Sequence, residues 1–122
     1  MLEYYLYILK DDRDNYKIGI SRNPFLREGE IKTHNPTAKL LFYRGYIGGN
    51  VSQKTRDDEK ILHNKFQNKR LWGEWFKLNK RDITKIWNFF GYSWMPSGGK
   101  FIGNNEALKI FDLNAKSEIE YK

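Results

Sequence analysis

The distribution of apolar residues near the start of the chain predicts two short β-strands separated by a polar turn. Residues 4–10 alternate loosely and are rich in Tyr, Leu and Ile, which favours a strand. The five residues from Asp11 to Asn15 have the polar character of a turn. Residues 16–21 are apolar again, so we predict that they pair with the first strand as a β-hairpin.

The next segment carries the end signals of a helix over about residues 24–33. Asn23 is a good N-cap residue, and Pro24 suits the first helical position. Gly29 weakens this helix. The dipeptide Asn35-Pro36 ends it, because the residue before a proline avoids the helical region.

A third strand and a second helix follow. Residues 40–47 are mostly apolar and end at Gly48-Gly49-Asn50, which indicates a strand closed by a turn. A longer helix begins at Ser52, and its predicted buried stripe consists of Ile61, Leu62 and Phe66.

The apolar spacing is clearest in the last predicted helix. Residues 73–78 form a turn followed by a short strand or extended segment, and Asn79 is placed to cap the helix after them. Apolar residues recur at i, i+3, i+4 and i+7, which is typical of an amphipathic helix. They are Ile83, Ile86, Trp87 and Phe90. Gly91 is the expected C-terminal stop.

The sequence after Trp94 is less regular. Residues 101–102 and 107–111 are apolar and are separated by Gly103-Asn104-Asn105, so they could form a small hairpin. We therefore predict one domain over residues 1–91 and a C-terminal extension of unknown role over residues 92–122.

The composition is that of a globular domain. The chain has 122 residues, of which 39% are hydrophobic and 16% aromatic, and it has no cysteine, which excludes disulfides and thiolate metal sites. No apolar run approaches the roughly 18 residues that span a bilayer, and the N-terminus lacks a secretory signal. We therefore expect a cytoplasmic protein without a membrane partner.

The net charge of +7 is unevenly distributed. Residues 60–90 contain eight Lys or Arg against two acidic residues, interleaved with aromatic side chains. Such a segment suits a polyanion whose bases or sugars meet aromatic faces, which points to nucleic acid. A well-solvated lysine-rich surface explains the same charge, so both interpretations stay open.

Five short motifs occur in the order found in the GIY-YIG endonuclease superfamily. They are Tyr5-Leu6-Tyr7, Lys17-Ile18-Gly19, Arg27, Glu59 with His63 and Phe66, and Gly73-Glu74-Trp75-Phe76 with Leu78. The chain most resembles the small phage and bacterial branch named after a phage T5 open reading frame, over about residues 4–90. The resemblance implies an α+β fold with a small three-stranded antiparallel sheet flanked by helices. A literal Tyr46-Ile47-Gly48 lies too far from Tyr7 to be the second motif, so we place it at the end of the third strand.

The resemblance also implies a metal-dependent DNA endonuclease. Glu59 matches the glutamate that holds a divalent ion, Mg²⁺ or Mn²⁺, which needs only one or two protein carboxylates; a surface acid is the alternative. Arg27 would contact the scissile phosphate with its fork-shaped donors, unless it only forms an ion pair with Glu28 or Glu30. Tyr7 would orient or deprotonate the attacking water. As a base near neutrality it needs neighbouring positive charge, because a free phenol has a pKa near 10.

Lys17 is the main departure from the superfamily, which has a tyrosine at this position. Tyr16 cannot substitute, because adjacent residues of a strand face opposite sides of the sheet. The branch that the chain resembles often carries a lysine here. Lys17 could lower the pKa of Tyr7 or hold a phosphate oxygen, but it cannot replace a phenol in kind.

Other candidates are weaker. His63 lies four residues after Glu59 on the same helical stripe and could orient a water, contact the leaving group or merely pack beside the sheet. His34, near the end of the first helix, is a lesser candidate. Glu74 could aid the site or anchor its turn, and the two aromatic residues after it are most simply core.

Several basic residues could contact the nucleic-acid backbone. The candidates are Lys65, Lys69, Arg70 and Lys77, followed by Lys80 and Arg81. Such contacts fix position and affinity but carry no sequence information. A solvated basic face is the alternative for each of them.

Two other functions remain open. A non-catalytic nucleic-acid-binding module could keep the fold and have lost turnover through Lys17. A protein-interaction domain with an incidental basic face would bind nucleic acid only weakly and in a way that salt abolishes. The sequence indicates neither the strandedness of the substrate nor the oligomeric state.

Overall fold

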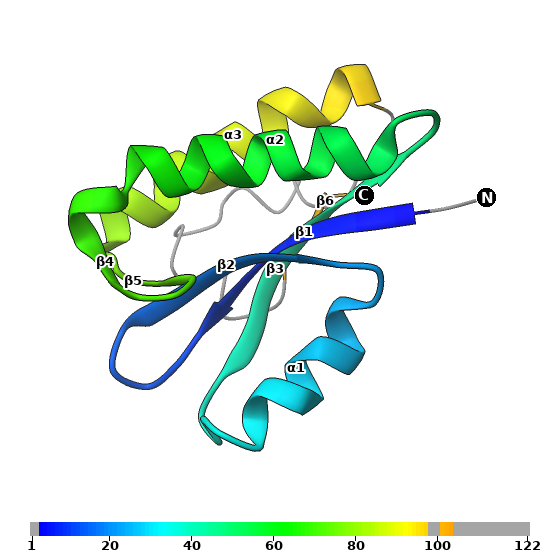
Figure 1. Ribbon diagram of the computed structural model, residues 1–122. Coiled ribbons are helices and arrows are strands. Elements are labelled where there is room, and N and C mark those ends of the chain that lie inside the picture. Colours follow the sequence, from blue (N-terminus) through cyan, green and yellow to red (C-terminus); the bar gives the residue numbers. More distant parts are fainter. Residues whose placement is uncertain (1–2, 98–100, 104–122) are drawn as a thin grey trace.

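A computed structural model describes residues 3–97 and 101–103 of the chain, which form an α+β fold (Figure 1). The elements in chain order are β1 (Glu3–Lys10), β2 (Asn15–Ser21), α1 (Pro24–Lys32), β3 (Lys39–Ile47), α2 (Val51–Lys65), a 3-10 turn (Gln67–Lys69), β4 (Arg70–Trp72), β5 (Trp75–Lys77), α3 (Lys80–Ser97) and β6 (Phe101–Gly103). The predicted hairpin, third strand and three helices all form, and each begins within about one residue of its predicted start.

The sheet is larger than predicted. Its strands run in the order β4-β5-β2-β1-β3-β6, and each neighbouring pair is antiparallel. The α+β class is confirmed, but the predicted three strands are only the centre of a six-stranded sheet. The strands β5 and β6 lie in segments predicted as short strands, but their pairing with the central sheet was not predicted. The strand β4 was not predicted, because three residues are too few to reveal the two-residue alternation of a strand.

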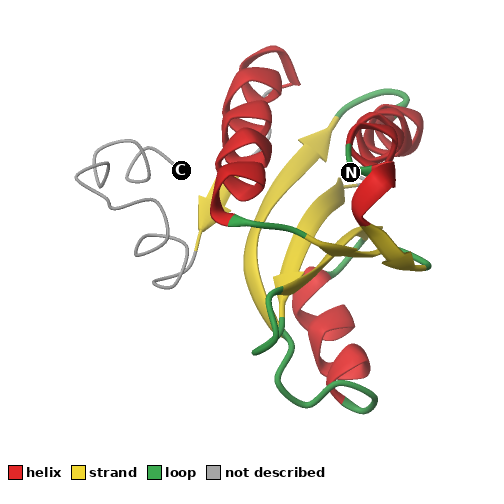
Figure 2. Cartoon of the chain, turned by 90° about the vertical axis from the view of Figure 1, so that its left-hand side faces the viewer, coloured by secondary structure: helices red, strands yellow, loops and turns green. Residues whose placement is uncertain are grey.

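Alternation along β1 divides its side chains between two layers of helices. Figure 2 shows α1 on one face of the sheet and α2 and α3 on the other. Leu6 and Ile8 belong to the larger core beneath α2 and α3. Tyr7 and Leu9 lie in a smaller cluster on the side of α1, which we call the α1 face.

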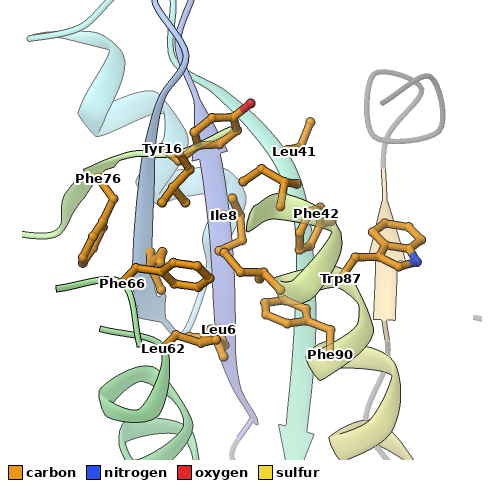
Figure 3. Packing of buried hydrophobic residues seen from close by; sticks show 14 of the residues in the cluster. Leu6, Ile8, Tyr16, Leu41, Phe42, Leu62, Phe66, Phe76, Trp87 and Phe90 are labelled. Atoms are coloured by element: carbon orange, nitrogen blue, oxygen red, sulfur yellow. The ribbon is translucent and has the colours of Figure 1, made fainter. Parts of the chain in front are cut away.

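The larger core joins aromatic and aliphatic side chains of both helices to the central strands (Figure 3). Phe42 of β3 meets Trp87 and Phe90 of α3 edge to face, with ring centroids 5.1 and 5.0 Å apart. Leu62 of α2 is buried, but Ile61, predicted to lie beside it, is 50% exposed. Successive helical residues point about 100° apart, so Ile61 turns away from the face that Leu62 buries.

Two predicted helix caps are confirmed, and one predicted stop is wrong. Asn23 Oδ1 accepts a hydrogen bond from Leu26 N at 3.1 Å. Asn79 and Asp82 cap the start of α3 reciprocally, each side chain accepting from the other's backbone N–H. Helix α3 continues past Gly91, whose cost inside a helix is only about 1 kcal/mol.

Residues 101–102, predicted to start a hairpin, belong to β6 and pair with β3. Their predicted partner, residues 107–111, lies outside the described residues. Among the residues that the structure describes, no helix is both long and apolar enough to cross a membrane.

Candidate active site

The side chain of Tyr7 lies over the neighbouring strand β2 at Gly19. Tyr7 pairs with Gly19 in the register of β1 and β2. A Cβ atom at position 19 would lie 2.6 Å from the Tyr7 hydroxyl and 3.1 Å from Glu74 Oε1. Position 19 must therefore lack a side chain if the phenol is to lie over β2 next to Glu74.

The outer edge of β2 is only partly covered by β5, which pairs with residues 15–17. At the next residue, Ile18 N donates to the backbone oxygen of Glu74 at 3.0 Å, and Ile18 O accepts from His63 Nε2 at 2.8 Å. The β4–β5 turn and α2 therefore meet β2 at one point. This meeting brings side chains from both faces of the sheet to the same edge.

Lys17 and Tyr16 face opposite sides of β2, as the two-residue period predicts. Tyr16 packs in the larger core, whereas Lys17 Nζ lies 2.7 Å from Glu74 Oε1. The pKa of Tyr7 is raised overall in the free protein, where Lys17 is paired with Glu74. Burial raises the pKa of Tyr7 to about 12, and a hydrogen bond with Arg27 offsets this only in part.

Arg27 of α1 has two partners. It donates a hydrogen bond to Tyr7, and its Nη1 lies 3.0 Å from Glu30 Oε1. Both partners of this ion pair are about half exposed, with side-chain exposures of 45% and 53%, so the pair contributes little stability. Glu28, the other predicted partner, instead accepts from Leu40 N at 2.7 Å. Arg27 is therefore placed beside Tyr7 and can exchange a weakly held partner for a phosphate.

Glu59 of α2 is a mostly buried carboxylate. Its side chain is 15% exposed, and its Oε2 atom has no hydrogen-bond partner among the described residues. Burial and the nearby carboxylate of Glu74 raise the pKa of Glu59 to about 7, while Lys17 and Arg56 oppose this rise. A solvated surface acid would show neither property, so that alternative does not describe Glu59.

His63 holds α2 against the edge of β2. Because its partner, the Ile18 carbonyl, can only accept, Nε2 must carry the proton of their hydrogen bond. The same Nε2 lies 3.8 Å from Glu59 Oε2. Burial lowers the pKa of His63, which favours the neutral form of the ring.

A buried charged group fixes the turn of α2 that carries Glu59. Arg44 of β3 is fully buried, and its Nη1 lies 3.3 Å from Asp58 Oδ2. The Tyr46 hydroxyl donates to the same oxygen at 2.5 Å, and the Arg44 guanidinium lies 4.2 Å from the centroid of the Tyr46 ring. Tyr46 thus belongs to the end of β3, as predicted, and its role is to anchor Asp58.

A cleft of about 650 Å³ lies on the α1 face, next to Lys17 and Arg27. Lys17, Arg27 and His34 contribute to its wall, and so do Trp72 and Trp75. The sequence did not place Trp72 next to Lys17, because it predicted neither β4 nor the pairing of the short strand at residues 73–78 with β2.

The residues predicted to contact the nucleic-acid backbone do not line this cleft. A second groove, of about 1010 Å³, has five basic residues in its lining, which we call the basic groove: Lys10, Lys69, Arg70, Lys77 and Lys80. Lys69 also pairs with the buried Asp82 at 2.6 Å, and Lys77 donates to the backbone oxygen of Arg13. Lys65 is exposed on α2 and does not line this groove.

The side chains around Gly19 fit a hard divalent cation with few protein ligands. The described ranges contain no group of three or more His, Asp or Glu that could hold a metal by themselves. Mg²⁺ commonly takes one or two carboxylates and keeps several waters. Glu59 offers a buried oxygen without a partner, and a cation would relieve its repulsion with Glu74. Glu74, whose role the sequence left undecided, therefore both anchors its turn and faces the site.

Gly19→Ala is expected to lower the free energy of unfolding by about 1–3 kcal/mol, because the added methyl group would collide with the Tyr7 hydroxyl. Gly29→Ala is the matched control, since a Cβ there meets no atom within 4 Å. In helix α1 this change should be neutral or stabilise by up to about 1 kcal/mol. Chemical denaturation measures both. Equal changes in the two variants would mean that the position of the Tyr7 side chain does not require a glycine at position 19.

Comparison with known proteins gives one match. The sequence pattern of the T5orf172 domain matches residues 4–91, a range that contains every side chain described around Gly19. No curated protein and no solved structure matches the chain.

Proposed function

The chain belongs to the T5orf172 domain family, and from this premise we propose that it is a divalent-metal-dependent endonuclease that hydrolyses DNA phosphodiester bonds. This family is nuclease-like and related to nucleic acids. One observation carries the proposal. A phenol that is hydrogen-bonded by a guanidinium, and an ammonium group, lie near a mostly buried carboxylate, although all four groups come from separate elements. One oxygen of this carboxylate has no hydrogen-bond partner among the described residues.

Each of these groups has a role suited to its state in the structure. Arg27 would leave Glu30 and bind the phosphoryl oxygens of the scissile phosphate, where its charge stabilises the transition state. Lys17, beside Glu74, would add a second positive charge. With its pKa near 12, Tyr7 would act as a hydrogen-bond donor that orients the phosphate or the attacking water, not as the base.

Glu59, with Glu74 beside it, would hold the divalent ion. A bound Mg²⁺ or Mn²⁺ supplies positive charge at the scissile phosphate. His63 keeps α2 in place through its hydrogen bond to Ile18 and so positions Glu59. We assign His63 a positioning role, because its protonated nitrogen is already used.

A cleavage assay tests the proposal. Wild-type protein is incubated with plasmid and with single-stranded DNA in Mg²⁺ or Mn²⁺, and in EDTA. Cleavage that requires the metal and disappears in Glu59→Ala is expected. Asp57→Ala is the matched control, because Asp57 is an exposed acid two residues away on the same helix. Cleavage that survives Glu59→Ala would contradict the assignment of the site.

A second function has one observation in its favour. The superfamily's second tyrosine is replaced by Lys17, which is engaged by Glu74 in the free protein. A non-catalytic nucleic-acid-binding module would therefore bind DNA through the same surface without turnover. Binding without metal-dependent cleavage in the same assay would support this function and reject the enzyme.

A further inference from the structure

Trp72 is a large apolar side chain that the fold leaves in solvent. It is 59% exposed, although the neighbouring core holds many aromatic residues. Its ring stacks on Trp75, with centroids 6.3 Å apart and planes inclined by 28°. Trp75 in turn packs against the cluster on the α1 face that contains Tyr7. The exposed ring is therefore held by a half-buried one.

The two tryptophans place this ring at the candidate active site. Trp72 and Trp75 line the same cleft as Lys17 and Arg27. The turn between them contains Gly73, with φ of 51°, and Glu74, which pairs with Lys17. One short hairpin thus carries both the exposed ring and a carboxylate of the site.

The other side of the same hairpin is positively charged. Leu71 and Arg70 line the basic groove, whereas Trp72, the next residue of β4, lines the cleft. The five basic residues of the basic groove face one acidic residue in its lining, Asp14. A polyanion is the ligand that this charge attracts.

We propose that the β4–β5 hairpin guides single-stranded nucleic acid: the phosphates follow the basic groove, and an unpaired base stacks on Trp72 beside Arg27. A charged groove next to an exposed aromatic ring is the combination by which proteins bind single strands, because every base has a face that stacks. In a duplex these faces are covered by neighbouring bases, so paired DNA cannot use Trp72. The inference rests on the proposed nucleic-acid function of the site and adds the class of substrate.

A structural explanation competes with this one. A cross-strand tryptophan pair can stabilise a hairpin without touching any ligand. This structural explanation predicts that loss of the Trp72 ring lowers the stability of the protein and changes the binding of single-stranded and double-stranded DNA equally. Selective loss of single-strand binding separates the two explanations.

The test measures binding of the full chain in EDTA, at fixed ionic strength, to a fluorescent oligothymidine of about 12 nucleotides and to a duplex of equal length. We expect tighter binding of the single strand. Trp72→Ala should weaken single-strand binding about 10-fold and leave duplex binding nearly unchanged. Trp72→Phe should retain most of the affinity. Ile61→Ala is the control, because it removes an exposed apolar side chain that lines neither the cleft nor the basic groove, and it should change affinity by less than about 2-fold.

Equal losses in Trp72→Ala and Ile61→Ala, or equal affinity for both DNA forms, would overturn the inference. Should Trp72→Ala fail to fold, tryptophan fluorescence decides: oligothymidine should quench the wild type much more than Trp72→Phe, and equal quenching would refute stacking. The readout needs no cleavage. If the protein does not cleave DNA but prefers single strands in a way that depends on Trp72, this inference holds and the endonuclease proposal is rejected. If the protein cleaves DNA with a metal but Trp72 has no effect on binding, the endonuclease proposal holds and this inference is rejected.

Discussion

Glu59→Gln is expected to abolish metal-dependent cleavage and, at pH 8, to stabilise the metal-free protein. Glutamine keeps the size of the side chain but removes the charge that would bind the ion. Loss of the several kcal/mol that a metal contributes to transition-state stabilisation corresponds to about a 1,000-fold slower reaction or more. Gel-based cleavage rates measure this effect.

The gain in stability follows from the pKa of Glu59. This pKa is raised from 4.5 to about 7 by burial and by the carboxylate of Glu74. Between these values the folded protein binds a proton that the unfolded chain has released, so the free energy of unfolding falls as pH rises from about 5 to 7. At pH 8 Glu59 is charged in the folded protein, and the full free-energy cost of burying this charge is present. Glu59→Gln removes the charge and should therefore stabilise the protein by about 1–3 kcal/mol.

Chemical denaturation in EDTA at pH 5 and pH 8 measures this contribution. The difference between wild type and Glu59→Gln should be large at pH 8 and small at pH 5, where the carboxyl group is mostly protonated. Adding Mg²⁺ or Mn²⁺ at pH 8 should raise the melting temperature of the wild type but not of the variant. The control Asp57→Asn should resemble the wild type throughout. A variant less stable than the wild type at pH 8 would contradict the raised pKa of Glu59.

Arg27→Ala is expected to slow cleavage by about 100- to 1,000-fold, because it removes a charged donor from the scissile phosphate. Its effect on folding should stay below about 1 kcal/mol, since the ion pair with Glu30 is exposed. Arg27→Lys should recover only part of the rate, because an ammonium group lacks the paired donors of a guanidinium. Single-turnover rates at saturating protein measure the chemical step.

Glu30→Gln decides between the two roles of Arg27. It removes the ion-pair partner and leaves the guanidinium free beside Tyr7, so the cleavage rate should be unchanged or higher. If Arg27 served only the ion pair, Glu30→Gln and Arg27→Ala would have equal, small effects. That outcome would leave Tyr7 and Lys17 without a phosphate-binding partner on α1.

The elements that the sequence indicated are those with long, regular signals. The aromatic strand at residues 4–10, the Asn23 cap and the i, i+3, i+4, i+7 spacing of α3 are local patterns, and the structure has all three. The stop at Gly91 failed because one glycine inside a helix costs only about 1 kcal/mol, which is too little to end it.

The candidate site was predicted as a set of residues but not as an arrangement. Motif order identified Tyr7, Lys17, Arg27 and Glu59 together. The sequence did not indicate the protonation and hydrogen bonding of these side chains, because both depend on burial. The raised pKa of Tyr7 and the lack of a hydrogen-bond partner for Glu59 Oε2 are caused by atoms far away in the sequence. The Mg²⁺ or Mn²⁺ expectation stays a prediction.

The sequence by itself determined the α+β class, the central hairpin, the helices and the family, because these depend on local periodicity and on the order of short motifs. Only the tertiary structure decided that β5 covers half of β2, that Glu74 pairs with Lys17, and that Trp72 stands at the cleft. The physical reason is that each of these depends on where a three-residue strand docks, and so short a strand carries no periodicity of its own. Its position is set by the backbone hydrogen bonds left free along β2 and by the core beneath it.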